Sequence, residues 1–214
     1  MRYRRFAAAT TLRATGARPR WIHAGFVALS RVQRFRWTMR IPQTGGVVLC
    51  GGHSSRMGQP KLALPFGEEV LLQRVCRILG EVVQPIVVVA AVEQQLPSLP
   101  DSIRIVRDDY DSLGPLAGIA TGLDALQDDC ESAFVTSCDV PLLRPEFVRA
   151  IVSRMEAHDA AVPNDKYDHV LAAAYRTELA AKARALLDSG QRRPLRLIDS
   201  VNCCRIPVDE LRTA

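Results

Sequence analysis

Residues 46–61 read Gly-Val-Val-Leu-Cys-Gly-Gly-His-Ser-Ser-Arg-Met-Gly-Gln-Pro-Lys, and this stretch decides how the rest of the chain is interpreted. The apolar run Val47–Cys50 has the composition of a buried strand. Gly51 and Gly52 follow it, and glycine lets a backbone approach an anion closely and direct N–H groups toward it. The pattern therefore predicts a strand that opens into an anion-binding loop.

The same loop carries two cations that narrow the choice of ligand. Arg56 and Lys61 would supply the positive charge that a polyphosphate needs, so we expect a nucleoside triphosphate. The loop is not a P-loop, because Lys61 stands three positions after Gly58 where a P-loop has glycine and lysine adjacent. It also lacks the Gly-x-Gly-x-x-Gly of dinucleotide sites. A plain glycine turn with two surface cations is the alternative.

Basic charge is concentrated at the N-terminus. Residues 1–40 contain ten arginines and no acidic residue, whereas the whole chain has a net charge of +5. The remaining residues hold 18 basic and 23 acidic side chains, so the region expected to fold is mildly acidic. The overall basicity is therefore no argument for nucleic acid, and we expect no nucleic-acid partner.

Residues 1–44 are interpreted as a disordered or non-native N-terminal extension. Arg31, Arg34 and Arg36 interrupt the apolar stretches that a signal peptide would need. The arginine-rich, acid-free composition also fits an organelle transit peptide. We favour a segment that does not fold, with translation upstream of a start at Met39 as one explanation.

The cysteines predict a reducing compartment. No Cys-x-x-Cys pair and no metal-finger spacing occurs, so reduced thiols are the simplest interpretation. No apolar run approaches the roughly 20 residues that span a bilayer, so we expect a cytoplasmic protein without a membrane partner. The six cysteines are Cys50, Cys76, Cys130, Cys138, Cys203 and Cys204.

Apolar segments with strand and helix periodicity alternate from residue 45 onward, which predicts a Rossmann-like α/β fold. In this fold a mostly parallel sheet is flanked by helices on both faces. The predicted strands are Val47–Cys50, Ile86–Val92, Ile103–Val106, Ala133–Ser137, Ala160–Val162 and Leu171–Tyr175. The predicted helices are Val70–Leu79, Gly114–Leu126, Arg144–Ala157 and Thr177–Leu187.

Two aspartates are expected to join the glycine loop at one sheet edge, because ligands of such sheets bind beyond the carboxyl ends of the strands. Asp108 follows the strand predicted to end at Val106. Asp139 follows the strand that ends near Ser137. Mg²⁺ prefers one or two carboxylates plus phosphate oxygens, so Asp139 is the candidate metal ligand. The alternative is an aspartate that caps the next helix.

Two glycines in the predicted helix Gly114–Leu126 have two interpretations. Gly118 and Gly122 lie one helical turn apart. Small residues on this face would leave room for a base or ribose, or would allow close packing of the helix on the sheet. The sequence does not separate the two.

Several polar residues near the C-terminus also have open roles. Arg192, Arg193 and Arg196 would grip the phosphate of a second substrate, or simply complement a helix C-terminus as solvated charge. His169 is expected to be a loop histidine rather than a ligand.

Three segments together resemble the motifs of the molybdenum cofactor guanylyltransferase (MobA) family. They are Gly46–Lys61, Asp108–Gly118 and Thr136–Pro141, and the likeness continues through Gly-Gln-Arg-Arg-Pro at 190–194. The resemblance implies a nucleotidyltransferase domain over 45–214 with the fold of nucleotide-diphospho-sugar transferases. It further implies transfer of GMP from GTP to the molybdenum–molybdopterin cofactor, with release of pyrophosphate.

The resemblance also implies the roles of individual residues. Guanine nucleotide would be held at Leu49, Cys50, Gly51, Lys61 and Asp108, and the loop pattern adds Gly52 as a candidate binding position. Magnesium bound with GTP would be held at Asp139, and Lys61, Arg56 and Asp139 would be the catalytic residues. GTP and molybdopterin are the implied substrates, with other molybdenum cofactor biosynthesis proteins or molybdoenzyme chaperones as further partners.

Other functions remain open from the sequence. The first alternative is a cytidylyltransferase of the same cofactor, or another NTP transferase that acts on a phosphorylated small molecule. A non-catalytic nucleotide-binding protein is the second. The Gly51-Gly52 pair favours guanine through the family likeness, and the retention of Lys61 and Asp139 favours an enzyme.

Overall fold

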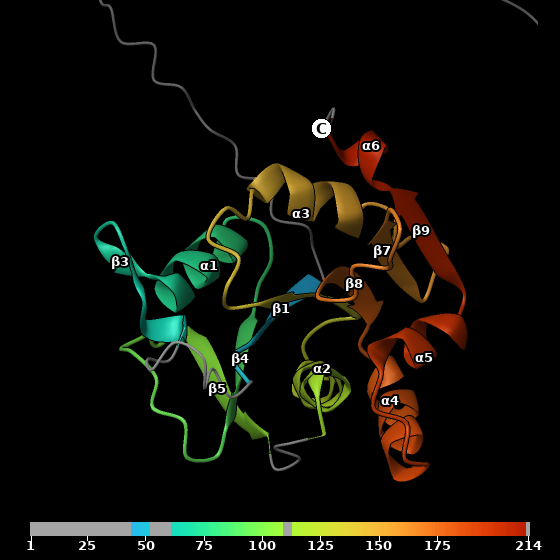
Figure 1. The fold of residues 1–214 in the computed structure, drawn as a ribbon, viewed down its shortest axis with the longest axis horizontal. Coiled ribbons are helices and arrows are strands. Elements are labelled where there is room, and N and C mark those ends of the chain that lie inside the picture. The colour runs from blue at the N-terminus through green and yellow to red at the C-terminus, as the bar shows by residue number, and fades with distance from the viewer. Residues whose placement is uncertain (1–43, 52–60, 109–112, 213–214) are drawn as a thin grey trace, which may run out of the picture. The chain divides into compact units, whose positions relative to one another are not determined.

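Seven strands form one sheet in the computed structural model, which describes residues 44–51, 61–108 and 113–212. They are β1 (Thr44–Leu49), β4 (Ile86–Ala91), β5 (Ile103–Asp108), β6 (Ser132–Ser137), β7 (Ala160–Asn164), β8 (Ala172–Arg176) and β9 (Cys203–Pro207). Their order across the sheet is β5-β4-β1-β6-β8-β7-β9 (Figure 1). The predicted N-terminal extension lies outside the described residues, except for Thr44, which begins β1.

Strand direction confirms the predicted mostly parallel sheet. β1 pairs in parallel with β4 and β6, β4 with β5, and β7 with β9. Within the described sheet, β8 runs antiparallel to both of its neighbours. The loop 165–171 that joins β7 to β8 is too short for a crossover, so these consecutive strands pair as a hairpin.

Helices cover both faces of the sheet, as predicted (Figure 1). α1 (Leu71–Gly80) and α3 (Pro145–Val152) pack on one face, against a core that includes Val48 and Phe134. On the other face, Val47 and Leu49 pack with α2 (Pro115–Asp124), α4 (Leu179–Asp188) and α5 (Pro194–Asp199). Because helices cover both of its faces, β1 is buried along its whole length, and this explains the apolar run Val47–Leu49.

Short elements are the part of the fold that the periodicity did not predict. They are the 3₁₀ turn η1 (Lys61–Ala63), the hairpin of β2 (Pro65–Phe66) with β3 (Glu69–Val70), the helices α5 and α6 (Val208–Leu211), and the edge strand β9. A helix or strand of a few residues has too little sequence to show a period. No helix in the described part of the chain is both long and apolar enough to cross a bilayer.

Gly118 and Gly122 bring α2 into direct contact with β1. A Cβ at Gly122 would lie 3.0 Å from Cγ2 of Val47 and still closer to its Cγ1, and 3.2 Å from Cγ2 of Val89. A Cβ at Gly118 would lie 3.2 Å from Cδ2 of Leu49. Both glycines therefore face the sheet, so the structure supports close helix–sheet packing rather than space for a base or ribose.

This packing makes Gly122→Ala destabilising. We expect the variant to lose about 1–3 kcal/mol of unfolding free energy, because the overpacking against Val47 exceeds the helix-propensity gain of alanine. Gly80→Ala in α1 is the matched control, since its Cβ would meet Ile86 at an ordinary 3.4 Å. Urea unfolding of both variants measures the difference. A Gly122→Ala protein as stable as Gly80→Ala would contradict the packing role.

Candidate functional site

The carboxyl ends of four parallel strands lie at one edge of the sheet. Leu49, the last residue of β1, is in register with Ser137, the last residue of β6. On the other side of β1, Ala91 at the end of β4 is in register with Asp108 at the end of β5. This arrangement brings the start of the glycine loop and both candidate aspartates to the same edge, as the sequence predicted.

Backbone hydrogen bonds continue just beyond β1 and fix the start of the glycine loop. The Cys50 amide donates to the Val89 carbonyl at 2.8 Å, and the Cys138 amide donates to the Leu49 carbonyl at 3.0 Å. The next residue, Gly51, is exposed. A Cβ built on Gly51 meets no described atom within 4 Å, so the space at this position is open to a ligand.

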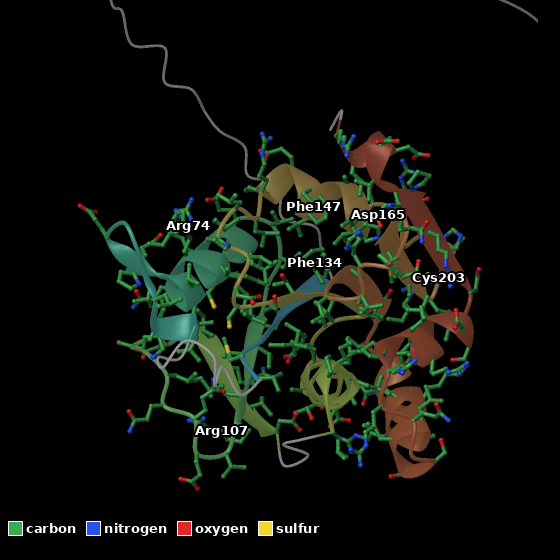
Figure 2. All side chains as sticks on the ribbon, viewed as in Figure 1. Arg74, Arg107, Phe134, Phe147, Asp165 and Cys203 are labelled. Carbon is green, nitrogen blue, oxygen red and sulfur yellow. The ribbon has the colours of Figure 1, made fainter. Side chains whose placement is uncertain are left out.

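Asp139 presents its carboxylate in the turn that follows β6. The residue is exposed, and the Ser137 hydroxyl donates a 2.6 Å hydrogen bond to its Oδ1. Arg74 on α1 donates from Nε to the Pro141 carbonyl at 2.8 Å and so ties the same turn to a helix (Figure 2). One oriented, solvent-accessible carboxylate fits a Mg²⁺ ion that completes its coordination with nucleotide phosphates and water. Among the described residues, no group of three or more His, Cys, Asp or Glu side chains could hold a metal ion.

Asp108 ends β5 two positions beyond the predicted strand end at Val106, because the pairing with β4 continues to Ala91. Its side chain is half-buried, and the Thr121 hydroxyl on α2 donates to its Oδ1 at 3.4 Å. Asp108 therefore faces the first turns of α2. That helix begins after Gly114, which adopts φ +85°, with Pro115 at its first position, so the predicted Gly-Pro start of the helix is confirmed.

Three residues of the predicted site, Gly52, Arg56 and Lys61, lie wholly or partly outside the described residues. Gly52 and Arg56 lie outside the described residues. Lys61 begins η1, but its side chain also lies outside the described part. Leu62 is buried in the same core as Cys50, so the backbone that follows Lys61 is anchored on the α1 face of β1.

Three cysteine side chains are buried together next to this sheet edge, on the α1 face of the sheet. The sequence did not predict that they would cluster. Cys50, Cys76 and Cys138 are buried in one core. The hydrogen bond to the Cys138 side chain, together with burial, raises the pKa of the Cys50 thiol well above its usual range. Burial raises the pKa of Cys76 to about 12. The thiols are therefore protonated near neutral pH and behave as small hydrophobic side chains.

One buried hydroxyl accompanies these thiols. Thr136 on β6 is 1% exposed, and its Oγ1 has no hydrogen-bond partner among the described residues. It lies two positions before Cys138, so both side chains project to the same face of β6. Nothing in the strand pattern signals this feature, because threonine is common in buried strands.

Three arginines follow α4, and the loop that contains the first of them lies close to the start of α2. The Arg192 carbonyl would lie 3.7 Å from a Cβ on Gly114, so the loop before α5 contacts the start of α2. Arg192, Arg193 and Arg196 are exposed and pair with no described carboxylate. Each of the other described arginines makes an ion pair or a hydrogen bond to a described residue. This contrast makes the three arginines candidates for binding an anion.

His169 lies in the loop between β7 and β8. Its Nε2 is 3.3 Å from Asp165 Oδ1, and both side chains are about half exposed. The Tyr167 amide also donates to Asp165 Oδ1 at 2.9 Å, and this bond, with His169, lowers the pKa of the Asp165 carboxyl. The pair stabilises the loop itself.

A cavity of about 460 Å³ opens at the other edge of the sheet, where β6 begins and β8 ends. None of the predicted site residues lines it. Arg176 and Glu131 on its wall form a 3.1 Å ion pair, so part of its charge is balanced internally.

In open α/β sheets, ligands bind beyond the carboxyl ends of the strands, which is where the glycine loop begins and where Asp108 and Asp139 lie. Residues 46–202 match the family model of the MobA-like NTP transferase domain. A probable molybdenum cofactor guanylyltransferase from Mycobacterium tuberculosis is 39% identical over 172 residues, which cover 78% of this chain and 85% of the relative. The chain belongs to the MobA-like NTP transferase family, and it is a nucleotidyltransferase.

Solved structures share the fold. Molybdopterin-guanine dinucleotide biosynthesis protein A from Archaeoglobus fulgidus superposes with a TM-score of 0.64 at 23% identity, over 79% of this chain and 86% of that one. A cytidylyltransferase from Leptospira borgpetersenii gives a TM-score of 0.58 at 16% identity, over 77% and 76% of the two chains. A Mycobacterium tuberculosis protein solved in complex with manganese gives 0.53 at 15% identity, over 77% and 88%.

The raised pKa of Cys76 predicts that stability falls in alkali. The folded pKa of about 12 exceeds the ordinary value of 9.0, so the thiol's contribution is complete below pH 9 and is lost as pH rises toward 12. We expect Tm to decrease between pH 9 and 11, because the unfolding free energy falls over this range. In Cys76→Ala the loss of unfolding free energy should be smaller by about 1.4 kcal/mol per pH unit. Cys204→Ala, on edge strand β9, is the control. Identical pH profiles for Cys76→Ala and wild type would contradict this prediction.

Proposed function

We propose that the protein transfers GMP from GTP to the molybdenum–molybdopterin cofactor and releases pyrophosphate. The observation that carries this proposal is the open backbone at Gly51 on the sheet edge that also bears Asp108 and Asp139. The relatives named as probable molybdenum cofactor guanylyltransferases support the choice of donor and acceptor. The reaction is expected in the cytoplasm, where proteins of the same biosynthesis or molybdoenzyme chaperones would be the partners.

The chemistry is an in-line displacement at the α-phosphorus of the nucleotide. A phosphate oxygen of the acceptor forms the new bond to phosphorus, while the bond to the β-phosphate breaks and pyrophosphate leaves. Lys61, Arg56 and the amides of Gly51 and Gly52 would stabilise the negative charge on that leaving group. The protein would therefore act by positioning and charge stabilisation, without a covalent intermediate.

Asp139 is the residue that would hold a divalent ion, and Mg²⁺ is the ion proposed. Bound there, the ion would neutralise charge on the nucleotide phosphates. The Ser137 hydroxyl, 2.6 Å from Oδ1, would keep the carboxylate turned toward the sheet edge. Leu49 and Cys50 would contribute by holding the start of the glycine loop in place, since their side chains are buried and their backbone groups bond to neighbouring segments.

Arg192, Arg193 and Arg196 are proposed to bind the acceptor's phosphate. Guanidinium groups match phosphate oxygens geometrically, and these three have no carboxylate partner among the described residues. The contact between the Arg192 backbone and Gly114 brings their loop to the start of α2, beside the proposed nucleotide site.

A panel of nucleotides separates this function from its alternatives. Purified protein with Mg²⁺ and molybdenum cofactor should release pyrophosphate from GTP faster than from CTP, ATP or UTP. A preference for CTP would identify the cytidylyltransferase instead. Nucleotide binding without pyrophosphate release would favour a non-catalytic role.

In that assay, Asp139→Ala should lower turnover at least about a hundredfold, because it removes the metal ligand. Lys61→Ala should weaken both GTP binding and kcat. Asp209→Ala on α6 and Lys182→Ala on α4 are the controls, since both positions are exposed helix surface. Wild-type turnover in either site variant would reject the role assigned to that residue.

Gly51→Ala tests whether a ligand approaches the loop backbone. Since a Cβ at Gly51 meets no described atom within 4 Å, Tm should change little. The added methyl would occupy the space that the nucleotide needs, so we expect GTP affinity to fall about tenfold, equivalent to about 1.4 kcal/mol. Calorimetric titration and thermal unfolding of the same sample measure both effects. Unchanged affinity would show that the nucleotide does not contact this position.

A further inference from the structure

The hydrogen-bond ladder between β1 and β4 is interrupted at the edge where the glycine loop begins. The Cys50 amide still donates to the Val89 carbonyl, which continues the parallel pairing of Leu49 with Val89. In a regular parallel ladder the next bond would join the Ala91 amide to the Cys50 carbonyl. That bond is replaced by the side chain of Gln94.

The Gln94 amide group bridges the two strand ends. Its Oε1 accepts from the Ala91 amide at 3.1 Å, and its Nε2 donates to the Cys50 carbonyl at 2.8 Å. One side-chain amide therefore satisfies both backbone groups that the separating strands would leave unpaired. The Cys50 carbonyl belongs to the peptide unit whose amide is that of Gly51, so the orientation of this peptide depends on Gln94.

Gln94 is in turn fixed by β5. The turn from Ala91 to Gln94 is closed by a 3.1 Å hydrogen bond from the Gln94 amide to the Ala91 carbonyl. Arg107 donates from Nη1 to the Ala91 carbonyl at 2.9 Å and to the Gln94 carbonyl at 2.8 Å (Figure 2). Arg107 immediately precedes Asp108. A continuous set of hydrogen bonds thus connects the end of β5, the turn after β4 and the Cys50–Gly51 peptide.

We infer that Gln94 is a positioning residue for nucleotide binding: its amide holds the Cys50–Gly51 peptide and, through the turn and Arg107, sets that peptide relative to Asp108. Gln94 itself is not proposed to touch the nucleotide. This inference rests on the proposed function, because it assumes that Gly51 and Asp108 contact the nucleoside triphosphate.

Gln94→Leu removes both side-chain hydrogen bonds and leaves a side chain of similar size. We expect its Kd and KM for GTP to rise about tenfold, with kcat and the KM for the acceptor within about twofold of wild type. A residue with a purely structural role would lower Tm without this selective change in KM. Calorimetric GTP binding, steady-state kinetics and thermal unfolding on the full-length protein provide the three measurements.

Gln73→Leu is a closely matched control. Gln73 Oε1 accepts from the Val70 amide three positions earlier at 3.2 Å, and its Nε2 donates to the distant Ser98 carbonyl at 2.9 Å. The same two bonds are thus lost without any change at Cys50. Gln73→Leu should lower Tm about as much as Gln94→Leu and leave the affinity for GTP unchanged.

The outcomes distinguish the inference from the proposed function. Equal GTP affinity in wild type and Gln94→Leu, or equal losses of affinity in Gln94→Leu and Gln73→Leu, would overturn the positioning role. A wild-type protein that bound no nucleoside triphosphate would overturn the proposed function and the inference with it. If Gln94→Leu does not fold, Gln94→Met, which keeps the side-chain length, is measured against the same criteria.

Discussion

The pairing of β1 with both β4 and β6 is the interaction on which the rest of the structure depends. β1 lies near the middle of the sheet, and its parallel register with β6 sets the end of one strand beside the end of the other. Because both strands stop at the same level, the chain must turn outward at Gly51 and at Asp139 on one edge. A shift of the register by one residue would turn Val47 and Leu49 toward α1 and break both cores.

Strand direction divides the sheet into a parallel part, from β5 to β6, and a part that begins with the antiparallel strand β8. From β5 to β6 the strands are parallel, and the polar groups proposed to hold the nucleotide follow their carboxyl ends. Beyond β6, the antiparallel β8 changes the pattern, and the segments after it supply the exposed arginines before and within α5. The segments proposed to bind the donor and the acceptor therefore come from separate lengths of chain, which meet where the Arg192 carbonyl approaches Gly114.

The sequence predicted those features that depend on composition or on local periodicity. The buried run before Gly51 and the β-branched run of β4 could be recognised as strands, because burial on both faces requires continuous apolar residues. β9 could not, since it is an edge strand with a mixed burial pattern. The end of β5 was placed too early because its last two residues are polar and are ordered by pairing with β4.

Other features depend on contacts that no single segment encodes. Gly118 and Gly122 fit two roles equally well until the side chains opposite them on β1 are known. Gln94 resembles any glutamine in a polar turn, and its contact with Cys50 arises only from the register of β1 with β4. The buried thiols of Cys50 and Cys138 are far apart in the chain, and they meet because of the register of β1 with β6.

The absence of a side chain at Gly122 has a consequence for motion. The γ-methyls of Val47 fill the space that a side chain at position 122 of α2 would occupy. The helix therefore cannot slide along the strand without a steric clash. α2 and β1 are therefore expected to move together in any rearrangement that accompanies ligand binding. Amide hydrogen exchange in α2 should accordingly be as slow as in β1.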